Sequence, residues 1–287
     1  MKSISLEGND AGIEMAPIPS ASYSNSKPDS LLETIPSTVV DFHVNTNFNP
    51  TASLQIQADG KHVISFPSPP KQLETPIFSP DTGRPVYISV RPRRRKGNCR
   101  LVLAEDSFET AIARTTYKWG PSHNPIVRIG RDDDIDADEF EMVRKNPLCR
   151  TVDFKTRQWG KFQWRYGSKS ERAQYAADNL LILEKVGGDG VARVRVAQLV
   201  RNDALRTPGT KHLAAGNGGR LQMGLVDEKG HELVDEVTVV VTCLVMLKKE
   251  IDRLRAIQIA SMSTGGGSPA LGCAMDSFAK VKSCFKS

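Results

Sequence analysis

The feature that most constrains this chain is an apolar run near its C-terminal end, at positions 237–247. The run contains no charged residue, and only Thr238 and Thr242 interrupt its apolar side chains. As a helix it would extend about 16 Å, roughly half the thickness of the hydrocarbon core of a bilayer. It is therefore too short to span a membrane, and we expect the rest of the chain to bury it.

The residues around this run favour a helix over a strand. The run itself is β-branched, which favours a strand locally. Acidic residues precede it and basic residues follow it, as the helix dipole prefers. These residues are Glu232, Asp235 and Glu236 on one side and Lys248, Lys249, Arg253 and Arg255 on the other. Apolar residues then continue at helical spacing. We predict one helix near 232–258; the alternative is a buried strand followed by a separate amphipathic helix.

Short apolar or alternating segments make up most of the chain before the helix. They lie at 38–44, 85–90, 99–103, 109–119, 125–129, 151–154, 161–166, 180–186, 191–197 and 219–225. We predict a hairpin over 53–66 with Asp59 and Gly60 as its turn, and a second one around the glycine-rich turn at 187–190. Because a sheet must bury its apolar face, the simplest fold is a curved antiparallel sheet closed around the helix.

Composition indicates a folded centre with disordered ends. Apolar residues make up 39% of the chain, which is low for a wholly globular protein. We expect disorder over 1–36, a mainly β domain over 37–260, and a disordered Gly/Ser-rich tail over 261–287. Inside the domain, the proline-rich stretch 67–85 predicts an extended connector, and 201–219 predicts a flexible insertion.

The order of these segments resembles one known family. A strand ending at 111–119 is followed by a Phe-x-Trp-Arg-Tyr strand at 162–166, then by 180–183 and 191–193, and finally by the apolar helix. This order resembles the fungal uncharacterised domains of the tubby C-terminal-like superfamily, to which tubby, the LURP-one proteins and the phospholipid scramblases are related. The resemblance implies a closed antiparallel β-barrel around a central hydrophobic C-terminal helix.

The same resemblance implies a non-enzymatic binding module. Tubby-type domains bind membrane phosphoinositides through basic residues, so the implied partner is an anionic membrane lipid. Those basic residues have no one-to-one counterparts in this chain, so none is assigned by the resemblance. A scramblase-like protein that translocates lipid is the alternative within the superfamily, and a nuclear regulatory protein is the alternative outside it.

The sharpest charge cluster lies between two predicted strands, and therefore on a loop. It consists of Arg91, Arg93, Arg94, Arg95 and Lys96. Such a cluster fits contact with lipid or other phosphate groups, or a nuclear import signal at 93–96; a solvated basic loop is the alternative. Aromatic residues do not alternate with these cations, so we do not expect a nucleic-acid partner. The net charge of +6 is compatible with a phosphate-rich partner.

Motifs for catalysis or metal binding are not found in the sequence. It contains no nucleophile elbow, Walker loop or paired Cys or His motif, so we expect no catalytic residue and no cofactor. The acidic segment 132–139 lacks the Gly and Glu positions of an EF-hand, so we expect a solvated loop and no metal site. The glycines at 216–219 are interpreted as part of a linker. Trp119, Trp159 and Trp164 are expected in the core or at the barrel rim.

The cysteines indicate free thiols and, at the C-terminal end, lipidation candidates. Five cysteines without paired spacing predict an intracellular protein, cytoplasmic with a peripheral membrane or nuclear location as alternatives. An N-terminal signal peptide is not expected, because no apolar h-region is present. Cys284 has the position of a prenylated cysteine, although Lys286 stands where an aliphatic residue is preferred, and Cys273 is a palmitoylation candidate. An unmodified tail is the alternative, and a protein partner is not specified.

Overall fold

The computed structural model describes most of the predicted domain. The described residues are 48–61, 73–91, 98–106, 110–117, 123–131, 133–144, 150–187, 193–211 and 214–263, with side chains up to 258. All of them belong to one of two compact units, which spans 43–287. The predictions made for 1–36, for the strand at 38–44 and for the tail beyond 263 lie outside the described residues.

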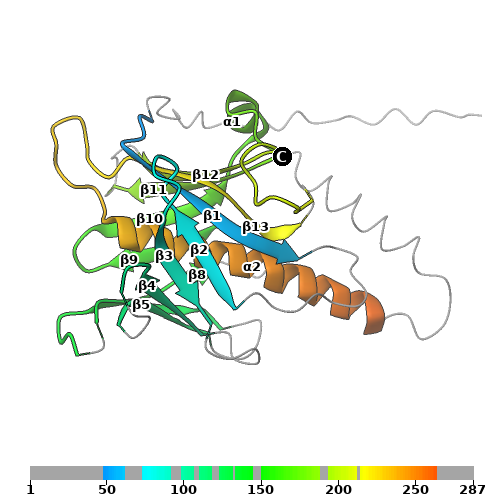
Figure 1. The fold of residues 1–287 in the computed structure, drawn as a ribbon, viewed down its shortest axis with the longest axis horizontal. Helices are drawn as coiled ribbons and strands as arrows, with labels where there is room; N and C mark the ends of the chain where they lie inside the picture. The colour runs from blue at the N-terminus through cyan, green and yellow to red at the C-terminus, as the bar shows by residue number, and fades with distance from the viewer. Residues whose placement is uncertain are drawn as a thin grey trace, which may run out of the picture. The chain divides into compact units, whose positions relative to one another are not determined.

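The described chain is mainly β and forms one antiparallel sheet of thirteen strands (Figure 1). The strands are β1 (Ala52–Lys61), β2 (Glu74–Phe78), β3 (Pro85–Val90), β4 (Cys99–Leu103), β5 (Ala111–Thr116), β6 (Ile126–Ile129), β7 (Asp138–Glu141), β8 (Val143–Arg144), β9 (Val152–Thr156), β10 (Gly160–Tyr166), β11 (Asn179–Val186), β12 (Val194–Arg201) and β13 (Ala215–Met223). Their order is β7-β6-β5-β4-β3-β2-β1-β13-β12-β11-β10-β9-β8. Strands that are neighbours in sequence therefore pair, except β7 and β8, which form the two edges of the sheet, and β1 pairs in addition with β13.

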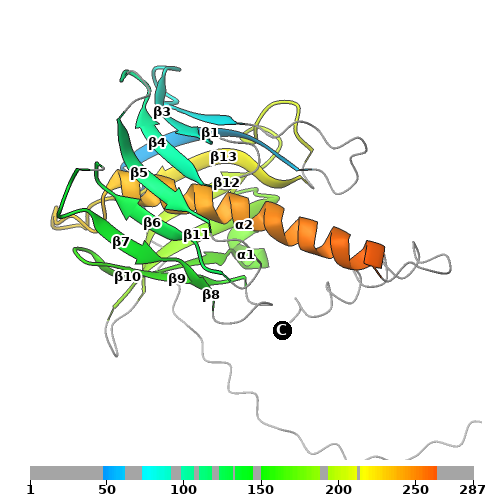
Figure 2. The ribbon, with the colours of Figure 1, turned by 90° about the horizontal axis from the view of Figure 1, so that it is seen from below.

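The sheet curls into a nearly closed barrel, whose two edges meet at a junction that we call the seam. At the seam β7 lies against β9 (Figure 2). The backbone N–H of Arg157 donates to Asp138 Oδ2 across it, at 2.9 Å. The stacked rings of Phe140 and Phe154 lie 5.1 Å apart, and those of Phe154 and Phe162 lie 5.2 Å apart. Side chains therefore hold the seam.

The apolar run forms the first turns of helix α2 (Glu236–Ser263), which runs through the barrel (Figures 1 and 2). The predicted helix is confirmed, although it starts at 236 rather than 232 and continues to 263. Its start is set by Asp235, whose carboxylate accepts from the backbone N–H of Thr238 at 2.6 Å, as an N-cap does. Val239, Val240 and Cys243 are fully buried, as a helix apolar on all sides requires.

A buried ion pair fixes the middle of α2 to the barrel. Glu250 accepts hydrogen bonds from both terminal nitrogens of Arg201 at 2.7 Å, from the Tyr166 hydroxyl at 2.6 Å and from the Gly216 N–H at 2.9 Å. Burial acts to raise the pKa of Glu250, but Arg201 and these hydrogen bonds hold it below its usual value. Gly216 has a φ of +71°, and a Cβ there would lie 2.5 Å from the Leu247 carbonyl oxygen. The close approach of α2 to β13 therefore requires glycine.

A second charged network lies around the short helix α1 (Lys169–Gln174), which the sequence analysis did not predict. Ser168 caps this helix in a capping box with Glu171. Glu171 pairs with Arg165 at 2.8 Å and with Arg195 at 2.5 Å, and Arg165 also pairs with Glu184 at 2.6 Å. The buried Arg195 and the partly buried Arg165 thus both have carboxylate partners.

The predicted hairpin at 53–66 is wrong. Strand β1 continues through Asp59 and Gly60 to Lys61 and pairs with β13 along its length. The register shifts between Ile56 and Asp59, and Gly60 has a φ of +67°. The glycine that suggested a turn instead supports a bulge, which also accommodates a left-handed residue.

The prolines at 67–85 do not prevent a strand. Strand β2 contains Pro76, opposite Ile88 of β3. Its pairing with β1 involves only Ile77 and Phe78, so the missing N–H of Pro76 is not required on that side. The extended connector is therefore wrong for 74–78, and residues 67–72 lie outside the described residues.

The segment 201–219 is also not a flexible insertion. Thr207 donates through its hydroxyl to the Ala58 carbonyl at 2.8 Å, and Gln55 donates to the Leu205 carbonyl at 2.7 Å. The glycines at 216–219 belong to β13 and not to a linker. Similarly, the end of the predicted acidic loop forms β7. The other predicted strands within the described residues are confirmed within a few positions.

We predict that Val240→Asp prevents the barrel from folding. Val240 is fully buried, and an unpaired buried charge costs several kcal/mol, comparable with the stability of a whole domain. Ile257→Asp is the matched control, because Ile257 lies on the same helix and is 41% exposed. Thermal unfolding followed by circular dichroism tests this. A cooperative Val240→Asp transition near the wild-type temperature would contradict the central role of α2.

We predict that Glu250→Leu lowers the free energy of unfolding by about 3–5 kcal/mol, because it leaves Arg201 buried without its carboxylate. The double variant Arg201→Met, Glu250→Leu should recover most of this loss, since it removes both charges. Denaturant titration of the two single variants and the double variant measures the coupling. Additive losses would show that the pair does not act as a unit.

Candidate functional site

The inner face of the barrel changes from apolar to polar towards one end. Inward residues alternate along each strand, and towards this end they are Ser89 and Arg91 after Tyr87, Cys99 before Leu101, and Thr115 and Tyr117 after Ala113. Cross-strand register places Thr75 opposite Ser89 and Cys99 opposite Thr115. Small and polar side chains from β2 to β5 therefore collect in one region of the interior.

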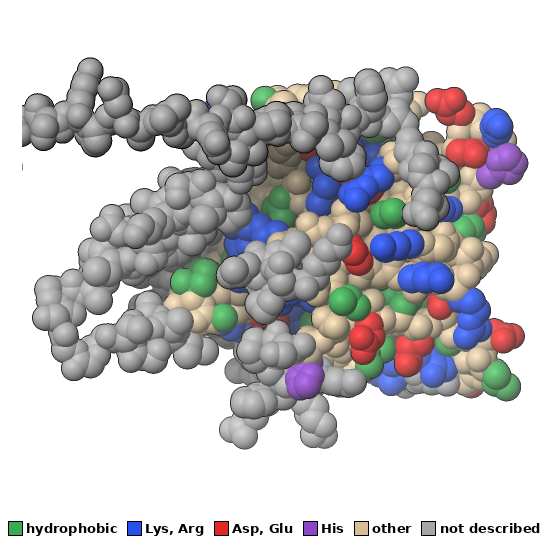
Figure 3. All heavy atoms as spheres, turned by 180° about the vertical axis from the view of Figure 1, so that it is seen from behind, with side chains coloured by type: hydrophobic (Ala, Val, Ile, Leu, Met, Phe, Trp, Pro, Cys, Tyr) green, Lys and Arg blue, Asp and Glu red, His purple; other side chains and the backbone are tan. Residues whose placement is uncertain are grey.

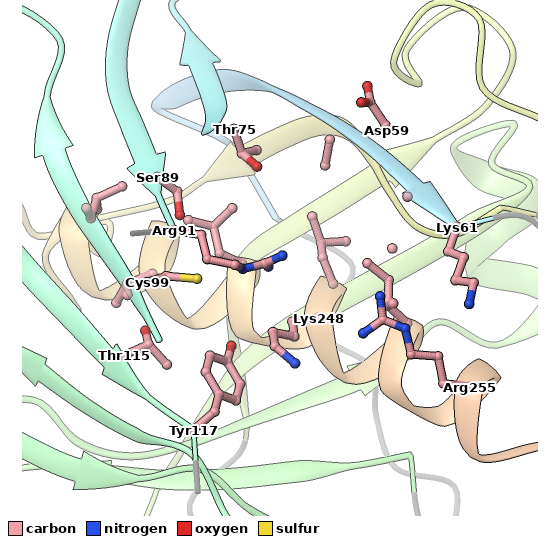
Figure 4. A pocket seen from close by; sticks show the side chains of 18 residues that line it. Asp59, Lys61, Thr75, Ser89, Arg91, Cys99, Thr115, Tyr117, Lys248 and Arg255 are labelled. Atoms are coloured by element: carbon pink, nitrogen blue, oxygen red, sulfur yellow. The ribbon is translucent and has the colours of Figure 1, made fainter. Parts of the chain in front are cut away.

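A cavity of 510 Å³ remains between this region and α2, and we call it the pocket (Figure 4). It is lined by Ala58, Asp59, Gly60, Lys61, Thr75, Ser89, Arg91, Cys99, Leu101, Thr115, Tyr117, Gly216, Val241, Leu244, Leu247, Lys248, Ile251 and Arg255. Along α2 the lining residues recur three or four positions apart, so one face of the helix forms the wall. The pocket exists because this face stops being purely apolar at Lys248.

The lining carries an excess of positive charge. Lys61, Arg91, Lys248 and Arg255 contribute cations, and Asp59 is the only carboxylate among the described lining residues. Figure 4 shows Lys61 and Arg255 near one another beyond the end of β1. Burial and the nearby Arg255 lower the pKa of Lys61. An anion between them would relieve this repulsion.

Two helix cations share one carboxylate. Lys248 Nζ lies 2.5 Å from Asp252 Oδ2, and Arg255 Nη1 lies 3.7 Å from Asp252 Oδ1. Lys248 Nζ also lies 4.4 Å from the centre of the Tyr117 ring. Burial raises the pKa of Tyr117 well above its usual value, so its hydroxyl stays protonated and can donate a hydrogen bond. Asp252 therefore orients the two cations and neutralises only part of their charge.

The rest of the pocket wall is apolar. Leu101, Val241 and Leu247 are buried there, and Leu244 and Ile251 of α2 are partly exposed. A cavity with an apolar wall and a few convergent charges is typical of a ligand site. The combination suits a ligand with an anionic group and an apolar part.

The structure places one residue of the predicted basic cluster at the pocket. Arg91 lines it, and within the described residues its Nε has no hydrogen-bond partner. Arg93, Arg94, Arg95 and Lys96 lie outside the described residues, as do the lipidation candidates Cys273 and Cys284. Arg91 and Cys99, the described residues that precede and follow 93–96 in the sequence, both line the pocket.

The other three cations of the pocket were not predicted from the sequence. Lys61 was assigned to a hairpin, and Lys248 and Arg255 were interpreted only through the helix dipole. The spacing of Leu244, Lys248, Ile251 and Arg255 could have indicated one mixed helix face. Of the tryptophans, Trp164 is fully buried as predicted and Trp159 packs against the core, whereas Trp119 lies outside the described residues.

Figure 3 shows charged side chains spread over the surface. On the part drawn in colour, Lys and Arg are interspersed with acidic residues, and apolar side chains form only small separate areas. Among the described residues, four large apolar side chains are exposed, and they come from separate parts of the chain: Ile135, Val143, Val226 and Ile257. Isolated exposed apolar residues are normal on protein surfaces and do not indicate a binding surface.

Within the described part of the chain, no helix is both long enough and apolar enough to cross a bilayer. Comparisons of the chain with protein-family models, with curated proteins and with solved structures find no match. The chemistry of the pocket is therefore the main indication of function.

We predict that Cys99 is the thiol that reports on the pocket. In a background with Cys149→Ser, Cys273→Ser and Cys284→Ser, only Cys99 and Cys243 remain. Cys99 is partly exposed, whereas Cys243 is buried and its burial raises its pKa to about 12. Cys243 should react with a thiol reagent at least roughly a hundredfold more slowly, because the thiolate is the nucleophile.

Mass spectrometry of native protein over a time course measures both rates. The same background with Cys99→Ser should lose the fast reaction. Reaction of Cys99 as slow as that of Cys243 in native protein would show that the pocket is not open to solvent.

Proposed function

We propose that this chain is a non-enzymatic binding module that takes the anionic headgroup of a membrane phospholipid or phosphoinositide. The observation that carries the proposal is the pocket, in which four cations surround a cavity of 510 Å³ with an apolar wall. Phosphate groups would contact Lys61, Arg91, Lys248 and Arg255, and the apolar part of the lipid would contact α2. Arg can meet a phosphate through two parallel hydrogen bonds, which adds geometric selectivity.

We also propose that the chain belongs to the tubby C-terminal-like superfamily. The architecture supports this, because a nearly closed antiparallel barrel around a C-terminal helix is what the sequence resemblance implies.

The basic loop would act together with the pocket. Arg91 begins the cluster and lines the cavity, so Arg93, Arg94, Arg95 and Lys96 follow within a few residues of the proposed headgroup site. Each basic residue near an anionic membrane contributes about 1 kcal/mol, and the effect fades over a Debye length. The loop would then supply attraction to the surface, and the pocket would supply selectivity for the headgroup.

We predict that Arg93→Ser, Arg94→Ser, Arg95→Ser together weaken binding to anionic vesicles roughly a hundredfold at physiological salt. The matched control is Lys155→Ser, Lys161→Ser, Lys229→Ser, which removes three exposed cations from β9, β10 and the turn before α2. Co-sedimentation with vesicles of phosphatidylcholine, with and without phosphatidylinositol 4,5-bisphosphate, measures the affinity across a salt series. The triple Arg→Ser protein is the loop variant. Added salt should weaken vesicle binding by the wild type far more than vesicle binding by the loop variant.

A second readout tests the pocket itself. Anionic vesicles should slow labelling of Cys99 in the background without the three other cysteines, and neutral vesicles should not. Equal vesicle binding by the wild type and the loop variant, with unchanged melting temperatures, would reject lipid contact by this loop. It would leave nuclear import through 93–96 or a solvated basic loop as the interpretation of the cluster. Lipid flip in reconstituted vesicles would instead identify the scramblase-like alternative.

A further inference from the structure

A second group of cations lies at the seam, on a face of α2 different from the one that lines the pocket. Arg144 of β8, Arg150 just before β9, and Lys249 and Arg253 of α2 line a small depression there. We call this group the seam cluster. Lys249 follows Lys248 by about 100° around the helix, so one stretch of α2 presents cations to two separate places.

The only carboxylate among the described residues that line the depression is already engaged. Glu250 accepts from Arg201, Tyr166 and Gly216 and is buried. Within the described residues, no carboxylate forms an ion pair with Arg144, Lys249 or Arg253. Lys249 donates to the Met142 carbonyl at 3.3 Å, which holds its ammonium group in place without neutralising it.

Packing holds these cations together against their repulsion. The guanidinium of Arg150 lies 5.1 Å from the centre of the Tyr166 ring. Burial and the nearby Arg253 lower the pKa of Arg150. Burial and the nearby Arg144 lower the pKa of Lys249 to about 8. A solvated basic loop would let such charges separate, but here a strand and a helix fix them.

We propose that the seam cluster is a second anion site, which takes the phosphate group of a ligand. The depression has a volume of 20 Å³, enough for a water-sized group but not for an acyl chain. A phosphate can place one oxygen in it while its other oxygens meet the guanidinium groups at the mouth. The site differs from the pocket in lacking room for an apolar group, and the proposal does not depend on the pocket's being a lipid site.

The test measures the rise in melting temperature with inorganic phosphate at pH 7.5, with sodium chloride replaced so that ionic strength is constant. The seam variant is Arg144→Gln, Arg253→Gln. It should raise the dissociation constant for phosphate at least about tenfold, because two charged hydrogen-bond donors are lost. In chloride alone it should melt at or above the wild-type temperature, because it removes like charges. Arg144→Lys, Arg253→Lys should keep part of the phosphate effect.

The pocket variant Lys61→Gln, Arg255→Gln is the matched control, since it also removes two cations. Because Lys61 and Arg255 are proposed phosphate ligands of the pocket, this variant should lose only the pocket's part of the response to phosphate. It should keep the part that the seam substitutions remove. Loss of the response in the pocket variant but not in the seam variant would overturn the second site and leave the proposed lipid pocket intact. An equal response in wild type and both variants would overturn it too, because the effect would then be a general salt effect.

A further experiment uses protein that carries the pocket substitutions Lys61→Gln and Arg255→Gln, and it determines which kind of ligand presents the phosphate. If the pocket variant binds vesicles of phosphatidylcholine that contain phosphatidic acid, and the seam substitutions abolish this binding, the phosphate comes from a lipid headgroup. A seam-dependent response to inorganic phosphate without such vesicle binding would identify a soluble phosphate. Both results support the site, and they differ only in which ligand presents the phosphate.

Discussion

The fold depends on burying the first three turns of α2. Val239, Val240 and Cys243 are fully buried, and residues that are apolar on every side of a helix need neighbours on every side. A flat sheet covers one side only, whereas a sheet closed into a barrel surrounds the helix. The seam follows from the same requirement, because β7 and β9 meet through Phe140 and Phe154 and so complete the enclosure. Glu250 then sets how far α2 extends through the barrel, through its contacts with Arg201, Tyr166 and Gly216.

The pocket is a consequence of where this enclosure ends. Up to Leu247 the helix is apolar, with Val241, Leu244 and Leu247 forming one wall of the pocket, and from Lys248 onwards its faces carry charge. The strands that meet this part present Ser89, Cys99 and Thr115 in place of large apolar side chains. Short polar side chains opposite a charged helix leave space that a close-packed apolar interior would not. The boundary between core and cavity is thus encoded at matching positions of the helix and of three strands.

The architecture was largely predictable from the sequence, because burial leaves a periodic pattern. The helix and the strands around Tyr87, Leu101 and Trp164 follow that pattern. The wrong predictions concern residues that are compatible with two backbone conformations. Gly60 suits a turn or a bulge, and Pro76 suits a connector or a strand with one partner at that position. Of the pocket cations, Arg91 belonged to an evident cluster, whereas the others became neighbours only through closure of the barrel, which one-dimensional spacing does not encode.

The charges of the described residues fall into two classes, and the difference bears on function. The deeply buried cations Arg195 and Arg201 each pair with a carboxylate, because an unpaired charge at such depth would cost several kcal/mol. Lys61, Arg144 and Arg253, at the ends of the strands and on the emerging part of α2, form no ion pair with a described carboxylate. At these partly exposed positions solvent makes an unmatched charge tolerable, so stability does not require a partner. Gathering such cations around the pocket and the depression along one helix does not stabilise the fold. The same arrangement does favour the binding of anions.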